Sequence, residues 1–200
     1  MDVTLSKEEV DVQECDVLVT GFFQDERPLQ GSSGWIDWRF NGMLSHFLTE
    51  KRLTGDWKET TLIPSQGRMD PKLLLLIGLG SAKDYSFLRI RELSPYLLET
   101  LKKLNLSSIC LSFPYEERYN VDCGKLVEVL LEGIADSIDL CQDVSLVNWT
   151  KELRLFFAEG EERFYEMYLG VQTAKLILRD RLKMKIFIPS EKIPETIQLE

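Results

Sequence analysis

The stretch Leu73-Leu-Leu-Leu-Ile-Gly-Leu-Gly-Ser-Ala-Lys-Asp84 joins five large aliphatic residues to two glycines and then to a polar segment. An unbroken aliphatic run is typical of a strand at the centre of a sheet that is covered on both faces. Glycines directly after such a strand allow a tight turn into a helix. The stretch therefore predicts a buried strand followed by a helix, and it raises the question of whether the turn binds a phosphate.

Strand-like and helical patterns alternate along the rest of the chain. Short β-rich runs predict strands at 16–23, 60–64, 72–77, 108–113, 153–157 and 185–188. Apolar residues spaced three and four apart predict helices at about 34–51, 86–104, 127–141 and 161–179. This alternation predicts an α/β fold, a three-layer α/β/α sandwich on a largely parallel or mixed sheet.

The chain of 200 residues contains no linker rich in Pro, Gly or Ser. We therefore expect a single domain over 1–200, with a core at about 14–180 and a C-terminal tail at about 181–200. No apolar run approaches the roughly 20 residues that span a bilayer. The N-terminal segment is acidic and has no apolar stretch, so we expect no secretory signal and a cytoplasmic location.

Charge and cysteine spacing disfavour several classes of function. The net charge of −9 disfavours nucleic-acid binding, although a local basic patch is conceivable at Arg179, Arg181, Lys183 and Lys185. The four cysteines are isolated and the chain has a single histidine, so the sequence predicts buried thiols, no metal site and no cofactor.

The glycine turn at Gly78 and Gly80 has two readings. A dinucleotide fingerprint requires a third glycine where Lys83 stands, and no Walker A loop occurs in the chain. The first reading is that the glycines only ease a tight turn. The second is a weak phosphate site at Gly78, Gly80 and Ser81, because ligands of open α/β sheets gather at the carboxyl ends of strands.

We expect no catalytic residues. The single histidine, His46, cannot supply both a triad and a metal site, and the paired glutamates are typical of solvated turns and helix starts. Trp35 and Trp38 flank the apolar stripe of the first predicted helix. We expect one of them in the core and the other partly exposed on a contact surface.

Several segments together carry a family resemblance. They are Ile36-Asp-Trp-Arg-Phe-Asn-Gly-Met-Leu44, Gly55-Asp-Trp-Lys-Glu-Thr-Thr-Leu62, the run from Leu73 to Gly80, and a helix that opens Arg89-Ile-Arg-Glu and closes Leu101-Lys-Lys-Leu104. In this order and spacing they resemble the N-terminal domain of the leucine (cytosol) aminopeptidase family. The resemblance covers roughly Asp16 to Leu178 and implies a macro-domain-like fold.

The resemblance does not imply peptidase activity. In that family the two metal ions and the catalytic lysine and arginine lie in a separate C-terminal domain, and its signature Asn-Thr-Asp-Ala-Glu-Gly-Arg-Leu is absent here. We expect a naturally short, non-catalytic module for binding, assembly or regulation. The implied partner is a second copy or a full-length aminopeptidase, with Trp35 and Trp38 at the contact.

The alternative is a macro domain that binds or hydrolyses ADP-ribose or a related nucleotide. Its candidates near the first strands would be Asp37 and the segment Gly31 to Gly34, but Pro114-Tyr-Glu-Glu117 stands where the glycine-rich diphosphate loop is expected. This alternative requires an open cleft at the ends of the strands that finish at Gly21, Ile77 and Phe113. Large side chains such as Phe22 and Tyr85 would close such a cleft.

Overall fold

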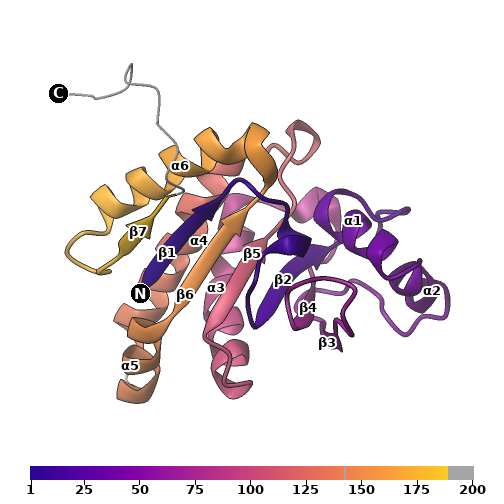
Figure 1. Cartoon of the computed structure of the whole chain (residues 1–200), viewed down its shortest axis with the longest axis horizontal. Coiled ribbons are helices and arrows are strands. Elements are labelled where there is room, and N and C mark those ends of the chain that lie inside the picture. The colour runs from indigo at the N-terminus through magenta and orange to yellow at the C-terminus, as the bar shows by residue number, and fades with distance from the viewer. Residues whose placement is uncertain (142, 189–200) are drawn as a thin grey trace.

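A seven-stranded sheet forms the centre of the computed structural model, which describes residues 1–141 and 143–188 (Figure 1). The strands are β1 (Asp2–Ser6), β2 (Val17–Phe22), β3 (Thr60–Pro64), β4 (Leu73–Gly78), β5 (Ser108–Ser112), β6 (Arg154–Ala158) and β7 (Lys185–Phe187). The α-helices are α1 (Gly31–Arg39), α2 (Met43–Thr49), α3 (Phe87–Lys103), α4 (Cys123–Leu140), α5 (Val144–Glu152) and α6 (Gly160–Ile177). Short 3-10 turns lie at Val10–Val12, Ala82–Asp84 and Glu117–Tyr119.

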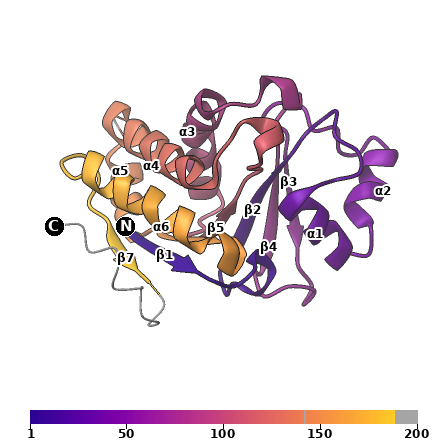
Figure 2. The ribbon, with the colours of Figure 1, turned by 90° about the horizontal axis from the view of Figure 1, so that it is seen from above.

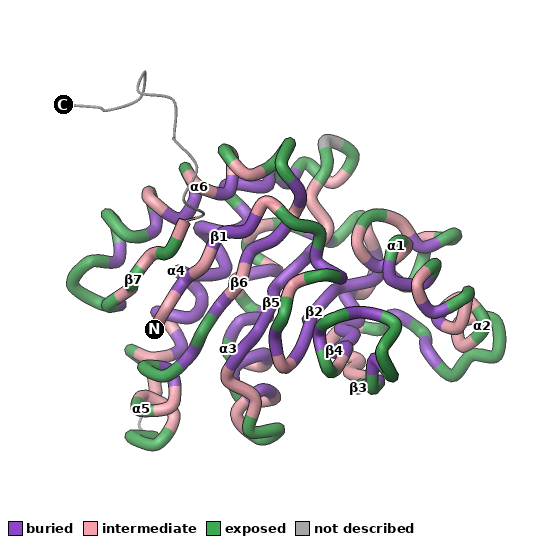
Figure 3. Tube along the Cα trace, in the orientation of Figure 1, coloured by how far each residue is buried: buried purple, intermediate pink, exposed green. Residues whose placement is uncertain are grey.

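The sheet is mixed, as the sequence predicts. Its strand order is β3-β4-β2-β5-β6-β1-β7, and only the pairing of β3 with β4 is antiparallel. The aliphatic run of β4 lies beside β2, with Leu75 opposite Val19, and both strands are almost entirely buried. Figure 3 shows this burial along the central strands, in contrast to the exposed residues of β7 at the edge.

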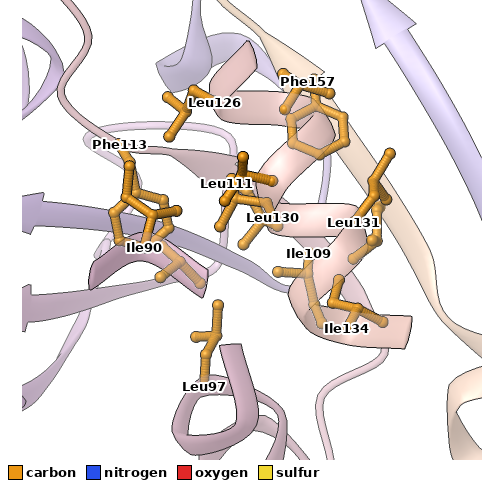
Figure 4. Packing of buried hydrophobic residues seen from close by; sticks show 14 of the residues in the cluster. Ile90, Leu97, Ile109, Leu111, Phe113, Leu126, Leu130, Leu131, Ile134 and Phe157 are labelled. Atoms are coloured by element: carbon orange, nitrogen blue, oxygen red, sulfur yellow. The ribbon is translucent and has the colours of Figure 1, made fainter. Parts of the chain in front are cut away.

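Helices cover both faces of the sheet, which confirms the three-layer α/β/α sandwich. One core joins α3, α4 and α6 to one face, and Figure 2 shows α3 and α4 together on that side. Ile109 and Leu111 of β5 point into this core toward Leu130 and Ile134 of α4 (Figure 4). A second, smaller core places α1 and α2 against the other face, where Ile36 is fully buried.

The helix predicted over 34–51 is in fact two helices. Asn41 and Gly42 have φ angles of 55° and 77°, a left-handed conformation that ends α1 and starts α2 in a new direction. The carboxylate of Asp37 accepts hydrogen bonds from the backbone N–H of Leu44 at 2.8 Å and of Ser45 at 3.1 Å. It therefore satisfies donors that the first turn of α2 cannot satisfy itself.

Two elements have no counterpart in the sequence prediction. The first is β1, a five-residue strand that lies between β6 and β7. The second is α5, a nine-residue helix between α4 and β6. None of the helices in the described parts of the chain is long and apolar enough to cross a membrane. Of the tail predicted at about 181–200, the part from 189 onward lies outside the described residues.

Candidate functional site

A cleft opens where the parallel strands β5 and β6 end. It has a volume of about 630 Å³, within the range of about 300–1,000 Å³ that is usual for small-molecule sites. Three segments form most of its wall: Phe113–Glu116 with Tyr119 after β5, Glu159–Arg163 at the start of α6, and 30–32 with Trp35 at the start of α1. Glu9 and Val10 complete the lining.

Glu159 is the central polar group of the cleft. It directly follows β6 and precedes Gly160, whose φ of +73° allows the chain to turn from the strand into α6. A Cβ atom at Gly160 would lie 2.7 Å from Oε1 of Glu9, so glycine also leaves room for that carboxylate. The glycine after β6 therefore allows Glu9, which follows β1, to lie near Glu159 at the carboxyl edge of the sheet.

The surroundings of Glu159 favour its protonated form. Burial raises the pKa of this half-buried carboxyl from an ordinary 4.5 to about 8, and repulsion from Glu9 adds to the rise. Hydrogen bonds from Ser112, Tyr115 and Ser32 act in the opposite direction. The Tyr115 hydroxyl donates to Oε2 at 3.3 Å. At neutral pH Glu159 can therefore both donate and accept a hydrogen bond.

The remaining charges make the cleft acidic. Its lining includes Glu9, Glu116, Glu161 and Glu162 against a single cation, Arg163. The N-termini of α1 and α6 both open onto the cleft and carry positive partial charge. At α6 this end already faces glutamates of its own chain. The cleft therefore suits a neutral or cationic polar ligand better than a phosphate.

Trp35 and Trp38 form an aromatic surface beside this cleft. Their rings stack with centroids 5.1 Å apart, and the side chains are exposed to 42% and 65% respectively. The prediction that one of them lies in the core was wrong. Ile36 of α1 and Phe40 directly after it are the buried apolar residues of this segment, and both tryptophans lie on its exposed side.

Arg39 fixes the tryptophan pair. Its guanidinium carbon lies 5.3 Å from the ring centroid of Trp35 and 5.4 Å from that of Trp38. The same guanidinium is 2.5 Å from Oδ2 of Asp11, whose side chain is buried. This ion pair ties α1 to the turn after β1 and holds the guanidinium of Arg39 beside both rings.

The predicted glycine turn lies apart from the cleft, since Gly78, Gly80 and Ser81 are not among the residues that line it. A Cβ at Gly78 would lie 2.0 Å from the carbonyl oxygen of Asp56, and Gly80 has a φ of +72°. The backbone N–H of Gly78 donates to Glu59 at 2.7 Å, and that of Gly80 donates to Gly55 at 2.8 Å. These glycines let a neighbouring loop pack closely against the strand.

Ser81 is also engaged within the chain. Its hydroxyl donates to the carboxylate of Asp25, which accepts a second hydrogen bond from the backbone N–H of Ala82 at 2.9 Å. The hydrogen bond from Ser81 is the main reason why the pKa of Asp25 is lowered. An internal carboxylate therefore occupies the donors that a phosphate would need, and phosphate binding at this turn stays a prediction.

Aromatic side chains fill the ends of the central strands. Phe22 and Tyr85 are both buried, and the ring centroids of Phe23 and Tyr85 are 5.0 Å apart in an edge-to-face arrangement. The Tyr85 hydroxyl donates to the carbonyl of Pro114 at 2.9 Å. The space at the ends of β2 and β4 is thus occupied, while the opening persists on the side of β5 and β6.

Sequence reasoning did not identify Glu159, Tyr115 or Glu9 as site residues. The available signal was Phe157-Ala-Glu-Gly-Glu161, in which an acidic residue and a glycine directly follow a buried strand. Asp37, the acidic residue named for the nucleotide alternative, instead serves α2 as described above. Among the described residues, no three His, Cys, Asp or Glu side chains are grouped so as to hold a metal ion.

The mixed sheet, the helices on both of its faces and the cleft at its carboxyl edge define a macro-like α/β/α domain. Among solved structures, the chain superposes on a Trypanosoma brucei macrodomain in complex with ADP with a TM-score of 0.59 at 13% identity, covering 84% of this chain and 67% of the other. A tomato leucine aminopeptidase mutant also gives 0.59 at 14% identity, covering 90% of this chain but 36% of the other.

The chain belongs to the cytosol aminopeptidase family, whose N-terminal domain it matches over residues 19–138. A probable cytosol aminopeptidase of Sulfurihydrogenibium sp. is 23% identical over 134 residues, which are 67% of this chain and 26% of the relative. The chain therefore spans about a quarter of the length of the curated relatives that it matches. The predicted resemblance to the N-terminal domain of this family is confirmed.

Proposed function

We propose that this chain is a non-catalytic binding and assembly module that docks a protein partner through Trp35 and Trp38. The observation that carries the proposal is the stacked, exposed tryptophan pair clamped by Arg39. Tryptophan and arginine are the residues most enriched among interface hot spots. Because the Asp11–Arg39 ion pair already restricts Arg39, little conformational entropy of this side chain is lost when a partner covers the surface.

Two features support a role without peptidase chemistry. The matched family segment is the N-terminal domain, and the exposed tryptophan pair is typical of a surface that contacts another protein. The partner that we propose is a full-length cytosol aminopeptidase of the same cell, with self-association of this chain as the competing arrangement. Both arrangements would use the same exposed aromatic surface.

The test measures molar mass by light scattering after size-exclusion chromatography at micromolar concentration. The wild-type chain, mixed with the full-length aminopeptidase, should elute as a complex, and Trp38→Glu should abolish the shift. Leu88→Glu is the matched control, because Leu88 is exposed to 67%, similar to the 65% of Trp38, but lies on α3. Clean separation of the wild-type proteins, with the chain alone monomeric, would refute the proposal.

A second candidate function is binding of ADP-ribose or a related nucleotide. The observation that favours it is the cleft at the ends of β5 and β6 in a fold shared with a macrodomain solved in complex with ADP. The acidic lining supports recognition of a nucleoside more than of a diphosphate. Calorimetry should therefore find adenosine binding at least as tightly as ADP-ribose.

Controls for the second candidate separate its two possible sites. A Glu159→Gln variant should alter the heats if the ligand occupies the cleft. A Ser81→Ala variant should alter them if the phosphate lies at the glycine turn of Gly78, Gly80 and Ser81. Flat titrations with both ligands up to about 1 mM, corresponding to about −4 kcal/mol, would remove this candidate.

A further inference from the structure

A second groove lies where β1 and β7 begin and where α4, α5 and α6 end, away from the cleft at the carboxyl ends of the strands. Figure 1 shows the N-terminus at the start of β1, with β7 beside this strand. Its volume is about 650 Å³. Its lining consists of Met1, Ile138, Val147, Thr150, Lys151, Lys175, Arg179, Asp180, Arg181, Leu182, Lys183, Met184 and Lys185. We call this surface the basic groove.

The basic groove concentrates positive charge on a chain of net charge −9. Six of its lining residues are cationic and one is acidic. Arg181 is neutralised by Asp136 and Asp139 at 2.7 and 2.6 Å, and Arg179 lies 3.5 Å from Asp180. The four lysines of the groove form no ion pair with any carboxylate of the described residues.

Those lysines are all exposed. Lys175 lies in the last turn of α6, while Lys183 and Lys185 lie in and just after the turn that leads into β7. Lys151 reaches only the side-chain oxygen of Asn148, at 2.9 Å. No carboxylate in the described part of the chain neutralises these ammonium groups, and their mutual repulsion would fall on binding an external anion.

Beneath the cations the floor of the groove is apolar. Met1 and Leu182 are buried, and Ile138, Val147 and Met184 are half-buried. A free phosphate or a carboxylate ion would leave this floor uncovered. The pairing of an apolar floor with a cationic rim calls for a ligand that carries apolar groups and carboxylates together.

We propose that the basic groove binds an acidic peptide segment of a partner protein in which carboxylate and aliphatic side chains alternate. Aliphatic side chains of the segment cover the floor, and its carboxylates contact Lys175, Lys183 and Lys185. This inference is independent of the proposed docking through Trp35 and Trp38, because neither tryptophan lines the basic groove. Neither result depends on the other.

The charge of the whole chain favours a peptide over extended polyanions. Nucleic acid and anionic membranes present charge over long distances, so they would also meet the acidic remainder of the molecule. A short segment contacts only the groove. At physiological salt the Debye length is about 8 Å, so the segment interacts mainly with the nearby lysines, and its repulsion by more distant acidic residues is screened.

The experiment follows the fluorescence anisotropy of a fluorescein-labelled octapeptide of alternating glutamate and leucine, titrated with untagged protein. An untagged chain is needed because Met1 lines the groove. We expect saturable binding that weakens as salt rises from about 50 to about 500 mM. A glutamine–leucine peptide tests the need for carboxylates, while inorganic phosphate and vesicles containing anionic lipid test the other sources of negative charge.

The deciding variant combines Lys175→Glu, Lys183→Glu and Lys185→Glu. It should weaken binding of the glutamate–leucine peptide by at least about tenfold, because three attractions become repulsions. Circular dichroism checks that it folds. Replacing the same three lysines by glutamine removes the attraction without adding like charge, and should give a smaller loss in the same direction.

The matched control combines Lys51→Glu, Lys83→Glu and Lys103→Glu, which are exposed lysines outside the groove and change the net charge equally. This control should stay within about twofold of wild type, since the local charge of the groove is unchanged. The proposal is overturned if the groove variant and the control variant, each with three Lys→Glu changes, lose binding equally, or if the glutamate–leucine peptide shows no saturation. It is also overturned if the glutamine–leucine peptide binds as tightly as the glutamate–leucine peptide, or if phosphate or the vesicles displace the peptide.

Discussion

Replacing Glu159 by glutamine should stabilise the protein at pH 8 and have little effect near pH 4. Burial raises the pKa of this carboxyl from 4.5 to about 8, with repulsion from Glu9 adding to the rise. Between these values the folded protein retains a proton that the unfolded chain has released. The wild-type stability contributed by this group therefore falls as pH rises through that window, and a neutral amide removes the dependence.

The magnitude follows from the width of the window. From 4.5 to about 8, at about 1.4 kcal/mol per pH unit, the ceiling is about 5 kcal/mol. We expect about 2 kcal/mol, because the carboxyl is half-buried in an open cleft where water solvates the charge that forms. The glutamine oxygen can still accept the hydrogen bond from Tyr115, so the packing of the cleft is retained.

Urea unfolding of both proteins at each pH from 4.5 to 9 measures this difference directly. The gap between the two curves should open steadily from pH 5 and become constant above pH 8. Glu162→Gln is the control, since Glu162 lines the same cleft but is exposed. Parallel stability curves for wild type and Glu159→Gln would show that the reasoning about burial is wrong.

Three further predictions concern packing, capping and thiol reactivity. Gly170→Ala should lower the free energy of unfolding by about 1–3 kcal/mol despite the better helix propensity of alanine. The Cβ atom of the alanine would lie 2.1 Å from the carbonyl oxygen of Gly124 in α4, and a higher melting temperature would contradict this close contact. Asp37→Ala should cost about 1–2 kcal/mol in urea unfolding through the loss of hydrogen bonds to α2, whereas Asp37→Asn should cost less. Iodoacetamide at pH 8 should label the half-buried Cys141 before Cys15, because burial raises the pKa of Cys15 to about 11. Mass spectrometry of digests measures the order of labelling, and labelling of Cys15 first would contradict this prediction.

The sheet was largely predictable because its central strands carry their own signal. The aliphatic run of β4 and the helical spacing in α3 and α4 are long enough to define element type without tertiary information. By contrast, β1 has only five residues, so its alternation of polar and apolar side chains is a short signal, and the strands on either side stabilise it. Such a strand acquires its conformation from pairing rather than from local propensity.

The candidate site was much less predictable, for a different reason. Glu9, Tyr115 and Glu159 are far apart in the sequence and meet only because β6 lies between β1 and β5 in the sheet. The break between α1 and α2 likewise depends on Asn41 and Gly42, which are not part of the apolar stripe from which the helix was predicted. Side chains that gather at a sheet edge depend on strand order, which local patterns do not encode.

The carboxyl edge of the sheet also shows why a shared fold does not transfer a ligand to this chain. A phosphate at such an edge uses free backbone N–H groups and the positive end of a helix. Here Gly80 donates its N–H to Gly55, and the start of α6 faces Glu159, Glu161 and Glu162. Two places where such an edge could hold an anion, the glycine turn and the start of α6, therefore face groups of the protein itself. For the nucleotide binding proposed above as the second candidate, we therefore expect a nucleoside to bind at least as tightly as a diphosphate, because binding depends on the side chains at this edge and not on the fold alone.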